Sequence, residues 1–300
     1  MRGREGAVHH SSPQLTIANL GELMILITGA TGNVGRVVVE RLADEGQPVR
    51  ALSRRPEQAQ WPAGVEAVAG DLGDVASVRP ALDGVESVFL FPAPEVGAEL
   101  VAAFEAAGVR HVVLLSSGAV EDGAEAQDGP IATRHHELEQ LLRASGMSWT
   151  FLRPDTFAVN ILPWSYQTKH GDEVRGAYAE AAAPVIHEAD IADAVVAALT
   201  SEGHAGKAYH LTGPELLTHA DQARVIGEVL GRPIRYVEID VEQVRRQMGA
   251  YVPAPILADI LKFWARSLEQ PHAVSGDVET LTGHKARDFR SWVEAHAEAF

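Results

Sequence analysis

The chain of 300 residues contains no cysteine. Disulfide bonds, a thiolate nucleophile and cysteine-ligated metal centres are therefore excluded. A redox reaction in this protein would have to use a bound cofactor. The length suits one large α/β domain, or a domain with a smaller appendage, whose core needs no covalent cross-links.

Positive charge and long apolar runs are also scarce. The 25 Lys and Arg residues stand against 41 Asp and Glu, which gives a formal net charge of −16. Such a chain repels nucleic-acid phosphates and anionic membrane surfaces. No apolar run reaches the roughly 18 residues of a membrane span, and residues 1–22 lack the pattern of a secretory signal. We expect a soluble cytoplasmic protein that binds neither nucleic acid nor membrane.

The most informative stretch is an apolar segment, residues 23–27, that runs into glycines three residues apart. It continues as Thr28-Gly29-Ala30-Thr31-Gly32-Asn33-Val34-Gly35. This pattern predicts a strand, a phosphate loop and a helix. A side chain at Gly29 or Gly32 would hold a pyrophosphate away from the backbone, and Gly35 would let the helix lie close to the strand. The segment therefore predicts a dinucleotide site at a helix N-terminus.

Two arginines follow the second predicted strand, residues 48–53. The end of this strand meets the adenosine ribose about 20 residues after the glycines in dinucleotide folds. An acidic residue there binds the 2′-hydroxyl of NAD, whereas arginine can pair with the 2′-phosphate of NADP. Residues 51–55 contain no Asp or Glu, so Arg54 and Arg55 favour NADPH over NADH. The alternative is a solvated basic turn.

Apolar strands and helices alternate along the rest of the first half. Further strands are expected at 65–69, 87–91, 111–116 and 148–152, and helices at 95–107 and 131–145. Alternation of this kind predicts a parallel sheet covered on both faces, with ligands at the carboxyl ends of the strands. Asp71, after the third strand, could accept a hydrogen bond from adenine or cap the next helix near Asp74.

The last third is less regular. We expect a helix that starts after residues 188–190 and runs through Ala198, a strand at 208–211, a helix from Thr218 to the glycine at 231, and a strand at 234–239. An apolar stripe from Pro255 to Trp264 has helical spacing. It either packs in the core or forms the wall or lid of a substrate pocket.

Several motifs together resemble the atypical short-chain dehydrogenase/reductases, and more narrowly their NmrA-like NAD(P)H-binding branch. That branch includes quinone-, azo- and triphenylmethane-dye-reductase-like proteins. The motifs are residues 28–35, 71–72, 116–118, 142–154, 209–214 and 281–283. The resemblance implies an α/β Rossmann fold, a doubly wound parallel sheet with a smaller, mainly C-terminal substrate-binding portion. We expect a flexible extension over 1–22, an NAD(P)-binding Rossmann core over 23–155, and a mixed segment over 156–300 that completes the core and forms the substrate-binding portion.

The resemblance also implies cofactor-binding residues by position. The pyrophosphate would be held by Gly29, Thr31, Gly32, Asn33 and Val34, and the 2′-phosphate by Arg54 and Arg55. Adenine would meet Asp71 and Leu72, and the nicotinamide side would be lined by Phe91, Pro92, Ser116 and Pro154. A substrate pocket would use Phe157, Asn160 and Trp164, although the two aromatic residues could equally pack in the core.

The sequence departs from the family at the catalytic positions. Most short-chain dehydrogenases place Tyr and Lys four residues apart on the helix after the fifth strand, with Ser before them. Here these positions fall on Ile131, His135 and Gly118, with Ser117 beside the last. Isoleucine cannot transfer a proton, so alcohol–ketone chemistry is disfavoured. His135 is either a half-buried structural residue or a ribose or substrate contact, and with Ser117 it forms the only alternative acid–base pair.

These observations predict an NADPH-dependent reductase that transfers hydride to a small conjugated or electrophilic acceptor, quinone-, azo- or imine-like. The alternatives are a non-enzymatic NADP(H)-sensing regulator, and an epimerase, dehydratase or reductase of a specialised metabolite. The helix around His135 lacks the spacing of a zinc site, and we expect no metal. We expect a small-molecule acceptor as partner and a monomer or homodimer.

Overall fold

The computed structural model describes residues 24–270 and 272–300, so the expected extension lies outside the described residues. Its centre is a seven-stranded sheet with the strand order β3-β2-β1-β4-β5-β6-β9, and every pairing in it is parallel. The strands are β1 (Met24–Ile27), β2 (Val49–Ser53), β3 (Glu66–Ala69), β4 (Val85–Leu90), β5 (His111–Leu115), β6 (Ser148–Pro154) and β9 (Lys207–Leu211). The predicted doubly wound α/β sheet is confirmed.

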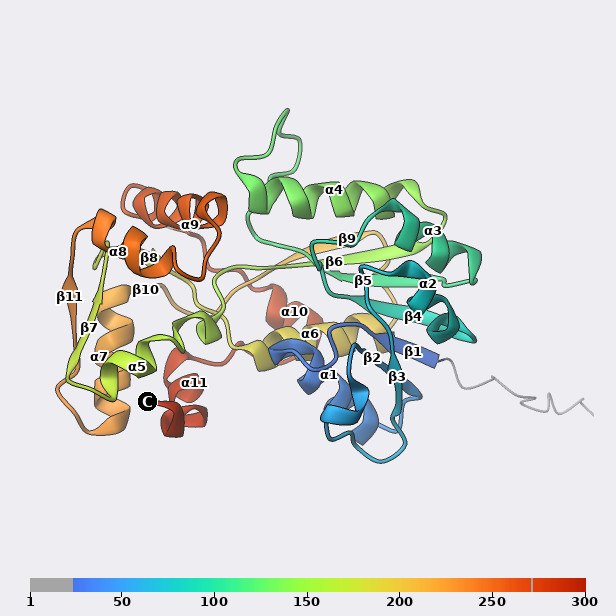
Figure 1. Cartoon of the computed structure of the whole chain (residues 1–300), viewed down its shortest axis with the longest axis horizontal. Coiled ribbons are helices and arrows are strands. Elements are labelled where there is room, and N and C mark those ends of the chain that lie inside the picture. The colour runs from blue at the N-terminus through green and yellow to red at the C-terminus, as the bar shows by residue number, and fades with distance from the viewer. Residues whose placement is uncertain (1–23, 271) are drawn as a thin grey trace, which may run out of the picture.

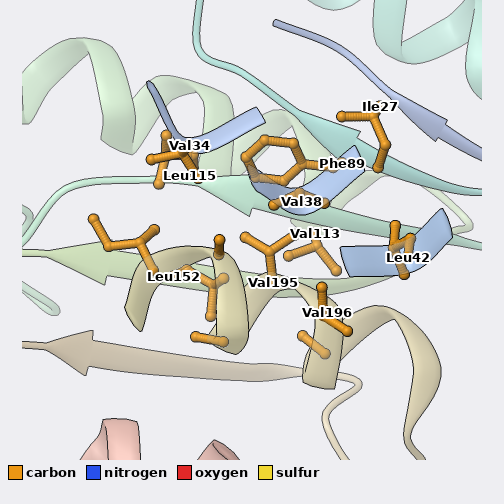
Figure 2. Packing of buried hydrophobic residues seen from close by; sticks show 14 of the residues in the cluster. Ile27, Val34, Val38, Leu42, Phe89, Val113, Leu115, Leu152, Val195 and Val196 are labelled. Atoms are coloured by element: carbon orange, nitrogen blue, oxygen red, sulfur yellow. The ribbon is translucent and has the colours of Figure 1, made fainter. Parts of the chain in front are cut away.

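Helices cover both faces of this sheet because its strands are apolar on both sides. One face packs against α1 (Asn33–Asp44) and α6 (Glu188–Thr200), and Figure 2 shows Val38 and Val195 of these helices beside Phe89 and Val113 of the sheet. The other face packs against α2 (Val75–Val78), α3 (Ala98–Ala106) and α4 (Pro130–Ala144). The order of the strands reverses between β1 and β4, and in such sheets the carboxyl ends of the strands on either side of this point form the ligand crevice.

The residues after β6 contribute both to the sheet and to a smaller assembly beside it (Figure 1). Strand β9 and helix α6 complete the sheet and its cover. The smaller strand pairs are β7 (Glu173–Gly176) with β11 (Arg235–Glu238), and β8 (Ala182–Ala183) with β10 (Leu217–Thr218). The helices are α5 (Trp164–Thr168), α7 (His219–Leu230), α8 (Val241–Met248), α9 (Ala254–Ser267), α10 (Asp277–Thr282) and α11 (Phe289–Ala295). Among the described residues, no helix is long and apolar enough to cross a bilayer.

Helix α7 begins and ends where the sequence predicts. Thr218 and Asp221 form a capping box, in which each side chain bonds the other residue's backbone N–H. Gly231 closes the helix with a φ of +65°, in the left-handed region that favours glycine. Helix α3 begins at Ala98, later than expected, because Gly97 takes the N-cap position.

Helix α9 carries the apolar stripe and lies against the start of α4. Leu257 and Leu261 are buried in a cluster that also includes Trp264, so the stripe packs in a core. A carboxylate oxygen of Asp259 accepts a hydrogen bond from the Ile131 N–H at 3.2 Å, which supplies α4 with an acceptor at its N-terminus. Asp128, just before α4, also pairs with Lys262 and Arg266 of α9.

A buried ionic network joins α4 to the ends of β5 and β6. Glu139 is only 1% exposed, and its carboxylate accepts hydrogen bonds from Ser116 at 2.6 Å and from Arg153 at 2.9 and 2.7 Å. Arg153 also makes two 2.8 Å bonds to Asp122. Burial alone would lower the pKa of Arg153, but these carboxylates raise it above its usual value. The network therefore holds charged groups in place at the carboxyl edge of the sheet.

Removing one partner of this network should strongly destabilise the fold. We expect Glu139→Gln to lower the free energy of unfolding by about 3 kcal/mol, because Arg153 loses a buried counter-charge. The matched control is Glu137→Gln, at an exposed position on the same helix. It should change the free energy of unfolding by less than about 0.5 kcal/mol. Urea denaturation of both variants measures this difference, and equal losses would contradict the assigned role of the network.

Candidate cofactor and substrate site

The first part of the site is the loop between β1 and α1. The Thr28 hydroxyl donates to the Phe89 carbonyl at 2.9 Å and accepts from the Phe91 N–H at 2.8 Å, which holds the ends of β1 and β4 together. Gly29 has a φ of +60°, and a Cβ there would lie 2.9 Å from the Phe91 Cβ. Only glycine satisfies both the backbone angle and the space at this position.

The start of α1 packs directly on this loop. A Cβ at Gly35 would lie 2.2 Å from the Gly29 carbonyl oxygen, so glycine is required where the helix meets the loop. Gly32 is the N-cap residue without a side-chain cap, and the first turn carries no acidic residue. The first N–H groups of α1 therefore have no side-chain acceptor from the cap, and the positive end of the helix dipole is uncompensated. This cradle fits a pyrophosphate.

A cavity of about 900 Å³ adjoins the loop and follows the carboxyl ends of β2, β3 and β4. Its lining includes seven residues that the sequence assigns to the cofactor: Gly29, Thr31, Arg54, Arg55, Asp71, Leu72 and Phe91. Gln58, Pro94 and Glu95 also line it. Gln58 ends a short 3-10 helix after β2, Pro94 and Glu95 lie in the loop after β4, and no motif in the sequence pointed to them. The volume is in the range of small-molecule sites.

The charged residues of this cavity differ in how they are engaged. Arg54 and Arg55 are exposed, and within the part of the chain that the structure describes neither has an ion-pair partner. Asp74 caps α2 through the Ala76 N–H at 3.1 Å, whereas Asp71 accepts from the Gly73 N–H at 3.0 Å. The helix cap is therefore Asp74, and Asp71 orders the loop while one of its carboxylate oxygens is left for a ligand.

The other predicted cofactor residues lie outside the lining of this cavity. They are Gly32, Asn33, Val34, Pro92, Ser116 and Pro154. Gly32 and Asn33 are exposed at the start of α1, and Val34 is buried beneath them. The Ser116 hydroxyl is buried and donates to Glu139, so it is already engaged within the protein. Phe91 remains 43% exposed beside the cavity and can offer a ring face to a ligand.

Helix α4 places Ile131 and His135 at the positions of the usual tyrosine and lysine. Burial lowers the pKa of His135 to about 4, so its imidazole is neutral at pH 7 and cannot supply the positive charge of a lysine. Its Nδ1 is buried and has no hydrogen-bond partner among the described residues. Ser117 Oγ accepts from the Ala119 N–H at 3.2 Å, and no bond joins Ser117 to His135 in the described chain.

The three expected substrate residues lie in different surroundings. Phe157 packs against the core of the α1 and α6 face, Trp164 contacts His219 and Tyr236 in the C-terminal assembly, and Asn160 is exposed. None of them lines the 900 Å³ cavity. The two aromatic residues therefore take part in packing, which is one of the two roles that the sequence left open for them.

One group of possible metal ligands lies elsewhere, between α6 and the segment after α10. Asp190, Asp193 and His284 bring their ligand atoms within 4.8 Å of one another. Arg287 pairs with both carboxylates, and Arg41 pairs with Asp193. These ion pairs account for the cluster as a link between elements.

Comparison with known proteins agrees with this geometry. Residues 29–202 match a family described as NAD(P)H-binding. The chain is 45% identical to the (4-alkanoyl-5-oxo-2,5-dihydrofuran-3-yl)methyl phosphate reductase of Streptomyces griseus, over 92% of this chain and 99% of that protein. It is 36% identical to the NAD(P)H azoreductase of Xenophilus azovorans, again over 92% and 99% of the two chains.

A solved structure is also similar. The NADPH-dependent quinone oxidoreductase of Escherichia coli, complexed with NADPH, has a TM-score of 0.76 and 28% identity and covers 92% of this chain and 100% of its own. The resemblance inferred from the motifs is thus confirmed. The chain belongs to the NAD(P)H-binding family and is an NAD(P)H-dependent oxidoreductase.

Proposed function

We propose that the protein is an NADPH-dependent reductase that transfers hydride to a small, conjugated electrophilic acceptor. The observation that carries the proposal is the cavity at the carboxyl edge of the sheet, which joins the glycine cradle to two arginines that have no ion-pair partner among the described residues. Arg54 and Arg55 would hold the 2′-phosphate, because guanidinium groups bind phosphate through charge-assisted hydrogen bonds. Bound NADPH supplies the hydride.

The surroundings of α4 support an acceptor that is already electrophilic. Ile131 offers no proton, and the neutral His135 cannot lower the pKa of a neighbouring acid by its charge. Positioning of the acceptor against the cofactor then supplies most of the rate acceleration. The buried Nδ1 of His135 would bind a ribose hydroxyl, which would satisfy a group that has no partner within the described chain.

The relatives point to one class of acceptor. The name of the Streptomyces griseus protein describes a lactone whose carbon–carbon double bond is conjugated with carbonyl groups, and the Xenophilus azovorans protein is named for azo compounds. The lactone and the azo compounds both contain an unsaturated bond that accepts hydride readily. We propose an acyl-substituted unsaturated lactone as the preferred acceptor of this chain, with azo dyes and quinones as further acceptors.

The acceptor class is tested by mixing the protein and NADPH with one acceptor at a time and following NADPH absorbance. An acyl-substituted unsaturated lactone, a quinone and an azo dye should each oxidise NADPH, whereas an unconjugated ketone should not. NADPH oxidation by the simple ketone alone, or by none of these compounds, would contradict the proposal.

The choice of cofactor is tested at Arg54. We expect Arg54→Asp to weaken NADPH binding by roughly 10- to 100-fold, since a hydrogen-bonded charge pair is lost, and to change NADH binding much less. Arg246→Asp, at an exposed position on α8, is the control for the change in net charge. Fluorescence titration with both coenzymes measures the affinities. Equal weakening of NADPH and NADH would show that Arg54 does not bind the 2′-phosphate.

The state of His135 has a consequence for stability. Its pKa is about 4 in the folded protein and about 6.5 in an unfolded chain. The unfolded chain therefore takes up a proton between these pH values while the folded protein does not, and the free energy of unfolding falls by up to about 3 kcal/mol as the pH drops through this window.

Substitution of His135 should remove this part of the pH dependence. The loss of stability between pH 7 and pH 4.5 should be smaller in His135→Leu than in the unsubstituted protein. His136→Leu, at the neighbouring position on α4, serves as the control and should keep the full loss. Urea denaturation at both pH values gives the comparison, and an unchanged loss in His135→Leu would refute the neutral buried state.

A further inference from the structure

Two histidines and a buried aspartate meet at the carboxyl ends of β6 and β9. Asp155 directly follows β6, and its side chain is 4% exposed. One of its carboxylate oxygens lies 3.1 Å from His272 Nδ1 and 3.5 Å from His210 Nε2. Burial alone would raise the pKa of Asp155, but the two imidazoles hold it well below its usual range. The carboxylate is therefore charged and directed at two imidazoles.

The backbone fixes this arrangement. His210 pairs with Arg153 in the sheet, and the Asp155 N–H donates to the Leu211 carbonyl at 2.9 Å. The His210 N–H donates to Asp277 at 2.8 Å. The other carboxylate oxygen of Asp155 accepts from the Thr156 N–H at 2.7 Å, so one oxygen is held by the backbone and the other faces the histidines.

Gly118 makes room for the His210 ring. It lies in the loop after β5, and its N–H donates to the Pro154 carbonyl at 2.9 Å. A Cβ at this position would lie 2.9 Å from His210 Nε2. The imidazole therefore occupies the space that any side chain at position 118 would need. This places the ring beside the ends of β5 and β6, at the edge of the sheet where ligands bind.

The two sides of the imidazole have different surroundings. Nε2 is buried between Gly118 and Asp155 and makes no hydrogen bond to the described residues, while 38% of the side chain remains exposed. The Asp155 carboxylate oxygen places negative charge 3.5 Å from this nitrogen, on the buried side of the ring, and the exposed side of the ring faces solvent. The exposed part of His210 can thus give a proton to a bound molecule and recover it from solvent.

We propose that His210 is the catalytic acid of the reductase, and that Asp155 and His272 are its positioning residues. The proposal rests on the proposed function, because it concerns the proton that must accompany hydride transfer to a neutral acceptor. With an azo compound, one nitrogen of the N=N bond gains hydride from NADPH and the other gains the proton that leaves His210. The products are a hydrazine and NADP⁺, and solvent returns a proton to His210.

Helix α4 does not supply a proton donor, and His210 would take that role. Neither Ile131 nor the neutral His135 can donate this proton at pH 7. His210 approaches the same strand ends from β9, on the far side of β6. The chain therefore brings its acid from the edge strand of the sheet.

The test compares an acceptor that needs a proton with one that does not. A neutral azo dye requires both hydride and a proton, whereas a cationic triphenylmethane dye becomes its neutral product on gaining hydride alone. We expect His210→Gln to slow single-turnover reduction of the azo dye by roughly 10²-fold, the scale of general acid catalysis, and to change reduction of the cationic dye by less than about threefold. His204→Gln, just before β9, should change neither rate.

Gly118→Ala provides a second variant, because its added methyl group should displace the flexible ring without unfolding the protein. This variant should also slow reduction of the azo dye more than reduction of the cationic dye, by a smaller factor than His210→Gln. Equal slowing of both dyes by His210→Gln would assign the histidine a structural role, and unchanged rates would refute the proposal outright. An unsubstituted protein that reduces none of the proposed acceptors would overturn the proposed function, and this proposal with it.

Discussion

The contact between Gly35 and the Gly29 carbonyl governs the geometry of the cofactor site at the carboxyl edge of the sheet. Because a Cβ at Gly35 would lie 2.2 Å from that oxygen, the start of α1 can approach the end of β1 only with glycine at this position. The approach directs the first N–H groups of the helix toward the crevice between β1 and β4. The Thr28 hydroxyl then joins β1 to β4, which sets the position of Phe91 beside the cavity.

A second set of constraints acts at the opposite side of the crevice. The buried Glu139–Arg153 pair holds α4 against the ends of β5 and β6, and Gly118 lets His210 approach the same ends from β9. Charged groups buried in this way contribute little net stability compared with apolar residues, but they fix geometry. Their cost is consistent with a site that must position an acceptor within a few tenths of an ångström.

The sequence predicted the fold better than the site. The seven strands of the sheet, the order of the flanking helices and the capping of α7 follow from local periodicity and from the glycine and threonine signals, which need no long-range information. Arg54, Arg55 and Asp71 could be placed because each follows a strand. The sequence could not predict the cluster of Asp155, His210 and His272, because three segments far apart in the chain form it. His210 stood within a recognised motif, but only the sheet register brings it to Asp155.

A crystal structure of the protein with bound NADPH tests the central claim most directly. We expect the 2′-phosphate within hydrogen-bond distance of Arg54 or Arg55, the pyrophosphate on the N–H groups at the start of α1, and the nicotinamide beside Pro154, where His210 can reach a bound acceptor. An adenosine end bound away from the two arginines, or a nicotinamide directed away from the ends of β5 and β6, would contradict this claim.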